Sequence, residues 1–270
     1  MELEEMFRIL DLQPEMIQRL DGVQKELDLA KLEVYLKRLQ DRKTAALANK
    51  QLQALFWEEE DHLKLLYCHL ECARRVFDKY QEKHIPQTIY QDTMRCFPRF
   101  LRECKGINGR MFFDRGWWTY RQISMSIFRI GALEYELREL EGEPVIDLHI
   151  PSDADLSKEA VEDSFTQAKV FFQTYYGSYP YKKYTCNSWL LSPAITPMLS
   201  EKSHIRSFQK RFQIIGENKE DKEFIGYLFQ VPENTDCKKF PESTSLQKKV
   251  KEWMLHGGRV GSALGVIPVY

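Results

Sequence analysis

The sequence predicts an α+β protein in which a helical bundle over residues 1–110 precedes a mixed α/β domain over residues 111–270. Three observations predict it. In the first part, apolar residues recur at steps of three and four, which is the period of an amphipathic helix. Gly106 and Gly109 then interrupt this helical pattern. From Ile123 onward, apolar and polar residues alternate in short runs separated by turn residues, which is the pattern of strands.

The helices of the first part follow from apolar stripes and from proline positions. Pro14 suits the first turn of a short helix that we expect to end near Gly22. Further helices are expected over residues 29–39, 44–57, 63–84 and from Pro86 onward. Pro98 should kink or split the last of these, because proline removes a helical hydrogen bond. Short polar joints between such helices favour an antiparallel bundle.

The second part reads as strands and helices in alternation. We expect one strand over residues 128–137, a turn at 141–144, a strand over 145–150 and a helix that Ser157 caps and that ends near Gly177. A strand over residues 184–191 should lead into a helix that begins at Ser192. Residues 207–217 and 224–231 are predicted to be strands, residues 246–255 a helix, and the tail to be extended.

The composition excludes several classes of function. The formal net charge of −1 gives no electrostatic argument for nucleic acid or for an anionic membrane. The longest apolar runs are too short to cross a bilayer, and the acidic start does not resemble a secretory signal. Six cysteines without CxxC spacing indicate reduced thiols, so we expect a cytoplasmic protein.

The stretch from Tyr184 to Ala194 carries more small polar residues than a core strand needs. Cys186 and Ser188 alternate with Asn187 and Trp189, so neither face of an extended strand is wholly apolar. Two interpretations stay open. The strand lines a binding cleft, or it is a core strand whose polar groups are satisfied by hydrogen bonds.

A known family shares several residues and motifs with this chain, most densely between residues 128 and 212. The matching positions are Arg129-Ile130-Gly131, Tyr135-Glu136, His149-Ile150-Pro151, Phe171-Phe172, Cys186, Ser188-Trp189-Leu190-Leu191, Pro193, Ser203-His204-Ile205 and Phe208. Over essentially its whole length the chain resembles bacterial acyltransferase-domain proteins, which join a helical N-acyltransferase N-terminal domain to a GNAT-like C-terminal domain.

The resemblance implies a sheet in which two strands splay apart, with acyl-CoA or acetyl-CoA in the gap as co-substrate. The usual mark of the CoA phosphate site in such folds is Q/R-x-x-G-x-G/A before a helix, and this chain lacks it. The nearest positional substitute is residues 191–194, where a strand was expected to feed a helix. The resemblance also implies an amine acceptor, either a small molecule or a peptide. The net charge and the short apolar runs described above argue against a nucleic-acid or membrane partner.

The candidate catalytic residues with ionisable side chains lie on two expected strands. Glu136 or Glu134 could remove the proton of an attacking amine, and so could His149, with Asp147 on the same strand face to orient it. The alternatives are a solvated strand face for the glutamates and a histidine bonded to a loop backbone. Arg129 could bind a phosphate or form a structural salt bridge.

The remaining candidates lie on the strand that begins at Tyr184. Cys186 could be a nucleophile with His149 as its base, or a small buried hydrophobe. Ser188, Trp189 and Ser192 could line the CoA site, or Ser188 could simply bond a neighbour. Tyr184 could reprotonate a thiolate leaving group, with Tyr135 and Tyr181 as further candidates for that acid. For all three tyrosines, aromatic packing is the alternative.

We expect no metal. The step Glu59-x-x-His62 occurs once, whereas di-iron bundles use it twice, and His69 and Cys72 fit an ordinary bundle helix. The function that these observations favour is an enzyme that moves an acyl group from a CoA or carrier thioester to an amine. The alternative is an inactive GNAT-like binding module for a small molecule or protein. The acceptor, the acyl length and the oligomeric state do not follow from the sequence.

Overall fold

The computed structural model describes residues 1–269, and it divides into two compact units, Met1–Arg129 and a second unit that begins at Ile130. The sequence placed this boundary at residue 110. The difference arises because the segment after α7 packs onto the helices of the first unit. The side chains of Thr119 and Asn49 bond His69, and the Asn49 amide donates to the carbonyl of Gly116 at 2.9 Å.

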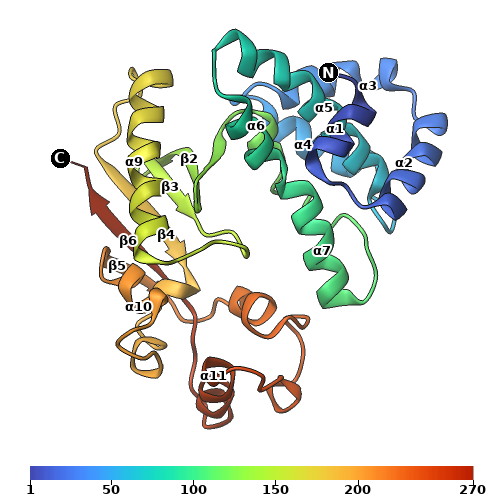
Figure 1. Ribbon diagram of the computed structural model, residues 1–270. Helices are drawn as coiled ribbons and strands as arrows, with labels where there is room; N and C mark the ends of the chain where they lie inside the picture. Colours follow the sequence, from blue (N-terminus) through green and yellow to red (C-terminus); the bar gives the residue numbers. More distant parts are fainter. Residues whose placement is uncertain (270) are drawn as a thin grey trace. The chain divides into compact units, whose positions relative to one another are not determined.

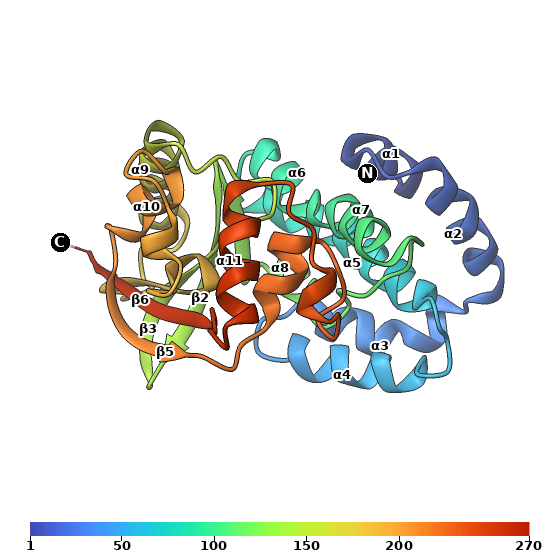
Figure 2. The ribbon, with the colours of Figure 1, turned by 90° about the horizontal axis from the view of Figure 1, so that it is seen from below.

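The first unit is entirely helical up to β1, as the sequence predicted. Helix α5 is its centre, since α1, α2, α3, α6 and α8 all contact it, and α3 and α4 lie side by side (Figure 2). The helices are α1 (Leu3–Leu10), α2 (Pro14–Glu26), α3 (Leu29–Leu39), α4 (Ala45–Leu55), α5 (Leu63–Glu82), α6 (Gln87–Met94), α7 (Cys96–Asn108) and α8 (Tyr120–Ile123).

Pro14 and Gly109 act where the sequence predicted, whereas Gly22 and Pro98 do not. Helix α2 does not end at Gly22, because buried Val23 continues its apolar stripe. The split between α6 and α7 falls at Arg95, so Pro98 lies in the first turn of α7, where a missing backbone N–H costs little. Gly109 ends α7 in the left-handed conformation, with φ of 72°.

The second unit is built on a mixed six-stranded sheet in the order β1-β2-β3-β4-β6-β5 (Figure 1). Its strands are β1 (Ile127–Ile130), β2 (Leu133–Leu140), β3 (Glu143–His149), β4 (Lys183–Ser188), β5 (Gln213–Asn218) and β6 (Ser262–Pro268). The pair β2/β3 is an antiparallel hairpin whose turn residues Glu141 and Gly142 both have positive φ, as a tight two-residue turn requires. Strand β4 pairs parallel to β3 through the crossover helix α9 (Lys158–Tyr175), and β6 pairs antiparallel to β4 and β5.

The expected single strand over residues 128–137 is two strands, because the chain turns at Gly131. This glycine has φ of 61°, and a Cβ atom there would lie 3.2 Å from Ser164 of α9. The Ser164 hydroxyl donates to the carbonyl of Ile130 at 2.5 Å and accepts from the N–H of Leu133 at 3.3 Å. The apolar positions change phase at this turn, from Phe128 and Ile130 before it to Leu133 and Tyr135 after it, so a single strand over the whole stretch was the wrong interpretation.

Helix α9 covers one face of the sheet of the second unit. Ser157 caps it as expected, and its Oγ accepts from the N–H of Ala160 at 3.3 Å. Phe165 of α9 contacts the ring of Tyr184, and Phe172 contacts the ring of Tyr135. This face therefore carries the apolar core of the unit, and the other face is left for polar side chains.

Three expectations for the later part of the chain were wrong. No α-helix begins at Ser192; short 3₁₀ turns, Trp189–Leu191 and Thr196–Met198, stand there instead. The segment 207–217 begins inside the helix α10 (His204–Gln209) and becomes strand β5 only at Gln213. Residues Ile225–Phe229 form a π-helical turn rather than a strand. In each case the apolar residues suit a half-buried strand and a short helical turn equally well.

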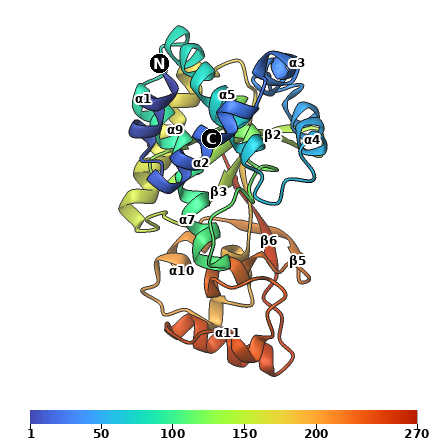
Figure 3. The same cartoon turned by 90° about the vertical axis from the view of Figure 1, so that its right-hand side faces the viewer.

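The segment between β5 and β6 has a small core of its own, and it extends beyond the edge of the sheet (Figure 3). The predicted helix is present as α11 (Ser245–Leu255), and Thr244 and Gln247 form a capping box at its start. The buried members of this small core are Phe224, Ile225, Phe229, Phe240, Val250 and Val260 of the segment, together with Ile195 from the chain before α10. Among the described residues, no helix is both long and apolar enough to cross a membrane.

Candidate active site

The polar face of the sheet is formed by alternate residues of three neighbouring strands. Because side chains alternate along a strand, the pairing of Glu136 with Asp147 and of Asp147 with Thr185 places all three on the same face. Tyr184 and Cys186 then lie on the opposite face, which α9 covers. The strand 183–188 is therefore a core strand on one side and a polar strand on the other.

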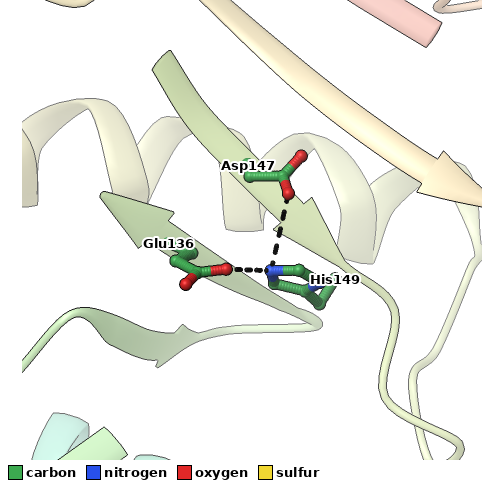
Figure 4. Close-up of side chains that lie close together, drawn as sticks. All are labelled: Glu136, Asp147 and His149. Carbon is green, nitrogen blue, oxygen red and sulfur yellow. Dashed lines mark hydrogen bonds and ion pairs between the residues drawn. The ribbon is translucent and has the colours of Figure 1, made fainter. Parts of the chain in front are cut away.

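Glu136, Asp147 and His149 come together on this face, at the end of β3 (Figure 4). His149 Nε2 lies 2.8 Å from Glu136 Oε2 and 3.9 Å from Asp147 Oδ2. The side chain of His149 is 19% exposed, whereas those of Glu136 and Asp147 are 10% and 5% exposed. The carboxylates are thus enclosed, while the imidazole is still open to a reactant.

Two donors hold Asp147 in place beside the histidine. Arg138 Nη1 donates to Asp147 Oδ2 at 2.7 Å, and the Thr185 hydroxyl donates to Asp147 Oδ1 at 2.6 Å. A buried carboxylate needs such partners, because desolvation without compensation is costly. Both oxygens of Asp147 are therefore engaged from neighbouring strands, and its charge is fixed in position.

These charges raise the pKa of His149 above its ordinary value. Burial by itself would lower that pKa, since it disfavours the imidazolium. The hydrogen bond that Glu136 accepts from the ring and the negative charges of Asp147, Glu136 and Glu134 outweigh the effect of burial. Since an ionised Glu136 can only accept, Nε2 carries a proton in the neutral ring, and the lone pair that can take up a proton is on Nδ1.

Strands β3 and β4 separate next to this cluster. Their parallel pairing consists of Ile146 with Tyr184 and Asp147 with Thr185. Beyond these residues, β3 still pairs with β2 as far as His149, and β4 still pairs with β6 as far as Ser188. The two central strands thus part at the position of the glutamate–histidine pair, and their facing backbone groups no longer pair with each other.

A cavity of about 300 Å³ opens on the same face, within the second unit. Asp147 and Thr185 belong to its wall, so the cavity begins beside the glutamate–histidine pair. It is lined by Arg138, Leu140, Val145, Asp147, Thr185, Asn187, Gly216, Glu217, Asn218 and Leu264.

The other expected acid–base residues are placed as follows. Glu134 is buried, pairs with His149 across the β2/β3 hairpin and adds to the negative potential at the imidazole. Tyr184 packs against the rings of Tyr135 and Tyr181. Burial raises the pKa of the Tyr184 phenol, and the hydrogen bond with Tyr181 raises it further.

Cys186 lies on the covered face and is fully buried. Burial raises the pKa of its thiol well above the ordinary value, and the charge of Asp147 adds to the effect. A nucleophilic cysteine needs a lowered pKa and access to substrate. His149 belongs to the other face of the sheet, so the geometry gives Cys186 the environment of a small core residue.

The residues expected to bind CoA have structural hydrogen bonds or packing contacts. The Ser188 hydroxyl accepts from the N–H of Leu190 at 3.2 Å, and the Ser192 hydroxyl donates to the carbonyl of Val260 at 2.5 Å. Trp189 packs against the small core beside α11. Arg129 belongs to the first unit, where its backbone N–H donates to Thr93 Oγ1 at 3.0 Å.

The donor atoms of Glu136, Asp147 and His149 all lie within 4.8 Å of one another, so this group could hold a metal ion. Arg138 and Thr185 already bond the oxygens of Asp147, and a guanidinium at this position competes with a cation. Of the other metal candidates, His69 bonds Thr119 and Asn49, and Glu59 accepts from the N–H of Lys64. The expectation that the protein uses no metal stays a prediction.

Three residues of this face were not identified from the sequence. Arg138 and Thr185 fix Asp147, and Asn187 lines the cavity. Arg138 follows Glu136 by two residues on the same strand, so alternation could have placed it on the polar face. The contributions of Thr185 and Asn187 depend on the pairing of strands far apart in the sequence, which no local pattern contains.

The comparisons with known proteins agree with this architecture. Residues 1–125 match the model of the N-acyltransferase N-terminal domain, and residues 127–267 match that of the GNAT-like C-terminal domain. No curated protein matches the chain.

Solved structures with low sequence identity have the same fold. One is an acyltransferase variant in complex with octanoyl-CoA, with a TM-score of 0.82 and 17% identity over 99% of this chain and 87% of that chain. An acyltransferase in complex with decanoyl-CoA has a TM-score of 0.74 and 19% identity over 100% of both chains. An acyltransferase in complex with decanoyl-CoA and teicoplanin has a TM-score of 0.72 and 16% identity, again over 100% of both. The chain therefore belongs to the family whose members join an N-acyltransferase N-terminal domain to a GNAT-like C-terminal domain.

Proposed function

We propose that this protein is an acyltransferase that moves an acyl group from the thioester of acyl-CoA to a primary amine. The observation that carries the proposal is the position of the buried Glu136–His149 pair where β3 and β4 part. A thioester held between the parting strands would have its carbonyl within reach of unpaired backbone N–H groups and of the base. Positioning and charge stabilisation of this kind supply most of the rate of acyl transfer.

The proposed reaction needs one base. The neutral imidazole of His149 takes a proton through Nδ1 from the amine as the nitrogen attacks the thioester carbonyl carbon, so that a C–N bond forms. The tetrahedral intermediate then breaks its C–S bond, and the imidazolium returns the proton to the leaving thiolate of CoA. Glu136 keeps the ring in the correct tautomer and stabilises the imidazolium between the two steps. Asp147 adds a fixed negative charge that does the same.

Family membership and the neighbouring structures support the choice of substrates. Octanoyl-CoA and decanoyl-CoA are bound by acyltransferases of the same fold, so we take medium-chain acyl-CoA as the donor. One of these acyltransferases is in complex with teicoplanin, which supports a small-molecule or peptide acceptor here. We further propose a bacterial enzyme, because the sequence resembles bacterial acyltransferase-domain proteins. We also propose that it is cytoplasmic, because all six cysteines are free thiols.

The test is turnover of purified full-length protein with octanoyl-CoA and decanoyl-CoA, in the presence and absence of a panel of primary amines. Release of CoA thiol and the mass of the acylated amine are measured together. We expect amine-dependent CoA release that His149→Gln and Glu136→Gln reduce by about 100-fold, which is the usual contribution of a general base. Glu233→Gln, an exposed change in the same unit, is the control. If both site variants keep the full rate, the assignment of the base is wrong.

One observation favours the alternative of a binding module without turnover. The N-terminal turn of α9, which follows β3, is already satisfied by this chain, because Ser157 caps it and Asp155 Oδ1 accepts from the N–H of Ser157 at 2.8 Å. A phosphate at this turn would meet a carboxylate instead of free N–H groups. Protein that binds amines but neither binds acyl-CoA in a thermal-shift measurement nor releases CoA would establish the binding module.

A further inference from the structure

The chain that leaves β3 uses its own side chains to bond the N-terminal turn of α9. Asp155 Oδ1 accepts from the N–H of Ser157 at 2.8 Å, and Ser157 Oγ accepts from the N–H of Ala160 at 3.3 Å. The bond from the N–H of Ser157 lowers the pKa of Asp155, so this carboxylate is ionised at neutral pH. A helix N-terminus binds phosphate through its first N–H groups and the positive end of its dipole, and here a carboxylate already stands against both.

The chain that leaves β4 bonds its first N–H groups in the same way. Ser188 Oγ accepts from the N–H of Leu190 at 3.2 Å, and Ser192 Oγ accepts from the N–H of Ala194 at 3.3 Å. The helical turns of this segment are 3₁₀ turns of 3 residues each, so they have no long row of aligned peptide dipoles. Both segments that follow the parting strands are therefore poor binding sites for a phosphate group.

The charges of these two segments also disfavour a phosphate. The loop before α9 and its first turn are net acidic, since they contain Asp153, Asp155 and Glu159 but only Lys158 as a cation. Residues 189–200, which follow β4, contain no charged residue. The pyrophosphate of CoA is an anion, so an acidic segment repels it and an uncharged one forms no ion pair with it.

The parting strands themselves suit the uncharged part of a thioester donor. Strands β3 and β4 pair with each other at Ile146 with Tyr184 and at Asp147 with Thr185, and they do not pair with each other beyond these residues. The pantetheine arm is an extended chain that contains amides, and an extended chain can bond the edges of strands as a further strand does. The gap between β3 and β4 therefore offers hydrogen bonds to pantetheine, while the segments beside it offer no ion pairs to the nucleotide.

We propose that this protein recognises its donor through the acyl chain and the pantetheine arm alone, so that an acyl-pantetheine thioester without a nucleotide is as good a ligand as acyl-CoA. The inference rests on the proposed function, because it takes the donor to be a thioester held where β3 and β4 part. Asp155 and Ser157 exclude the pyrophosphate from the N-terminal turn of α9, and the nucleotide of CoA adds no affinity.

The test uses full-length protein and two matched probes, octanoyl-CoA and octanoyl-pantetheine, which differ only in the nucleotide part. Dissociation constants are measured by isothermal titration at low and high salt, without an acceptor. Wild type should bind octanoyl-pantetheine as tightly as octanoyl-CoA to within about threefold, because one charged hydrogen bond to a phosphate would make a difference of about tenfold or more. High salt should not weaken octanoyl-CoA relative to octanoyl-pantetheine, whereas it would weaken a phosphate held by ion pairs.

Asp155→Lys removes the carboxylate and places a cation at the N-terminal turn of α9. It should make octanoyl-CoA bind about fivefold more tightly at low salt and leave octanoyl-pantetheine unchanged, and the gain should fade at high salt. Glu139→Lys is the matched control, because this exposed residue undergoes the same change of charge but pairs with Pro144, at the opposite end of β3 from α9. The control should leave both constants unchanged, and melting temperatures show that both variants are folded.

The proposal is overturned if wild type binds octanoyl-CoA more than about threefold more tightly than octanoyl-pantetheine, or if Asp155→Lys leaves the ratio of the two constants at its wild-type value. Failure of the proposed function gives a different result. If neither thioester binds, the transferase is wrong and this inference falls with it, whereas a strong preference for octanoyl-CoA removes the inference alone. If both thioesters bind equally and no amine is acylated, the mode of donor recognition stands and the transferase falls.

Discussion

Replacing His69 by glutamine should make the first unit less sensitive to acid. His69 is completely buried in α5, where Nδ1 lies 2.7 Å from Thr119 Oγ1 and Nε2 lies 2.9 Å from Asn49 Oδ1. The Asn49 amide nitrogen donates to the carbonyl of Gly116, so its oxygen must be the acceptor for Nε2–H. The ring is therefore neutral, with its lone pair on Nδ1 facing the Thr119 hydroxyl.

The magnitude follows from the pKa of this ring. Burial lowers the pKa of His69 to about 3, whereas a histidine in the unfolded chain has a pKa of about 6.5. Between these values the unfolded state binds a proton that the folded state does not, so the free energy of unfolding falls as the pH falls. From pH 7 to pH 5 the expected loss is about 2 kcal/mol.

The assay compares wild type with His69→Gln by urea unfolding at pH 7 and pH 5, with exchange of α5 peptides read by mass spectrometry to follow the first unit. The substitution costs stability at pH 7, because it disrupts a buried hydrogen-bond network. That cost should be smaller at pH 5 by about 2 kcal/mol, since only wild type is penalised by acid. Other titrating groups cancel in the comparison. An equal cost at both pH values would refute the assignment of a buried neutral ring.

Three further outcomes are expected. Glu136→Gln removes a negative charge and weakens a charge-assisted hydrogen bond, both of which raise the pKa of His149, and it leaves the burial that lowers this pKa. The acidic limb of the kcat/KM profile should therefore move to lower pH. An unmoved limb would mean that His149 is not the titrating base. Because the folded pKa of His149 is raised, wild type should be most stable relative to His149→Gln below about pH 6.5 and lose that advantage as the pH rises through the raised pKa, as measured by melting temperature. Gly131→Ala should destabilise the protein by about 1–2 kcal/mol, because φ is 61° at this position and Ser164 lies 3.2 Å from the new Cβ. Gly22→Ala, in the open middle of α2, should stabilise it by about 0.5–1 kcal/mol. Urea unfolding that gives both substitutions the same sign would contradict this account.

The local sequence pattern correctly predicted the elements that are long and periodic and that begin or end at a capping residue or a helix breaker. Helices α3 to α5, the crossover helix capped by Ser157 and the helix α11 all have an apolar stripe together with a cap or a break. It failed for short apolar segments, such as Ile225–Phe229, because a few apolar residues suit a strand and a helical turn equally. The interpretation of residues 128–137 as one strand was also wrong, because the chain turns at Gly131, whose φ is positive, and the apolar positions change phase there.

The candidate site shows the same division. Alternation along the expected strand placed Asp147 and His149 on one face, and Glu134 and Glu136 on one face of another strand. The register of β2 against β3 turns these two sets of side chains to the same side of the sheet. This register brings Glu136 Oε2 to 2.8 Å from His149 Nε2.

The sequence by itself therefore determined the order of a helical part and a mixed part, and it identified which side chains are candidates for acid–base chemistry. Both depend on residues that are close together in the chain, namely on the period of the apolar residues and on the residue types found at turns. The tertiary structure decided which strands are neighbours, where β3 and β4 part, and that Thr185, Arg138 and Asn187 share a face with His149. Strand pairing joins residues far apart in the chain through backbone hydrogen bonds that are chemically alike, so local side-chain patterns do not specify it.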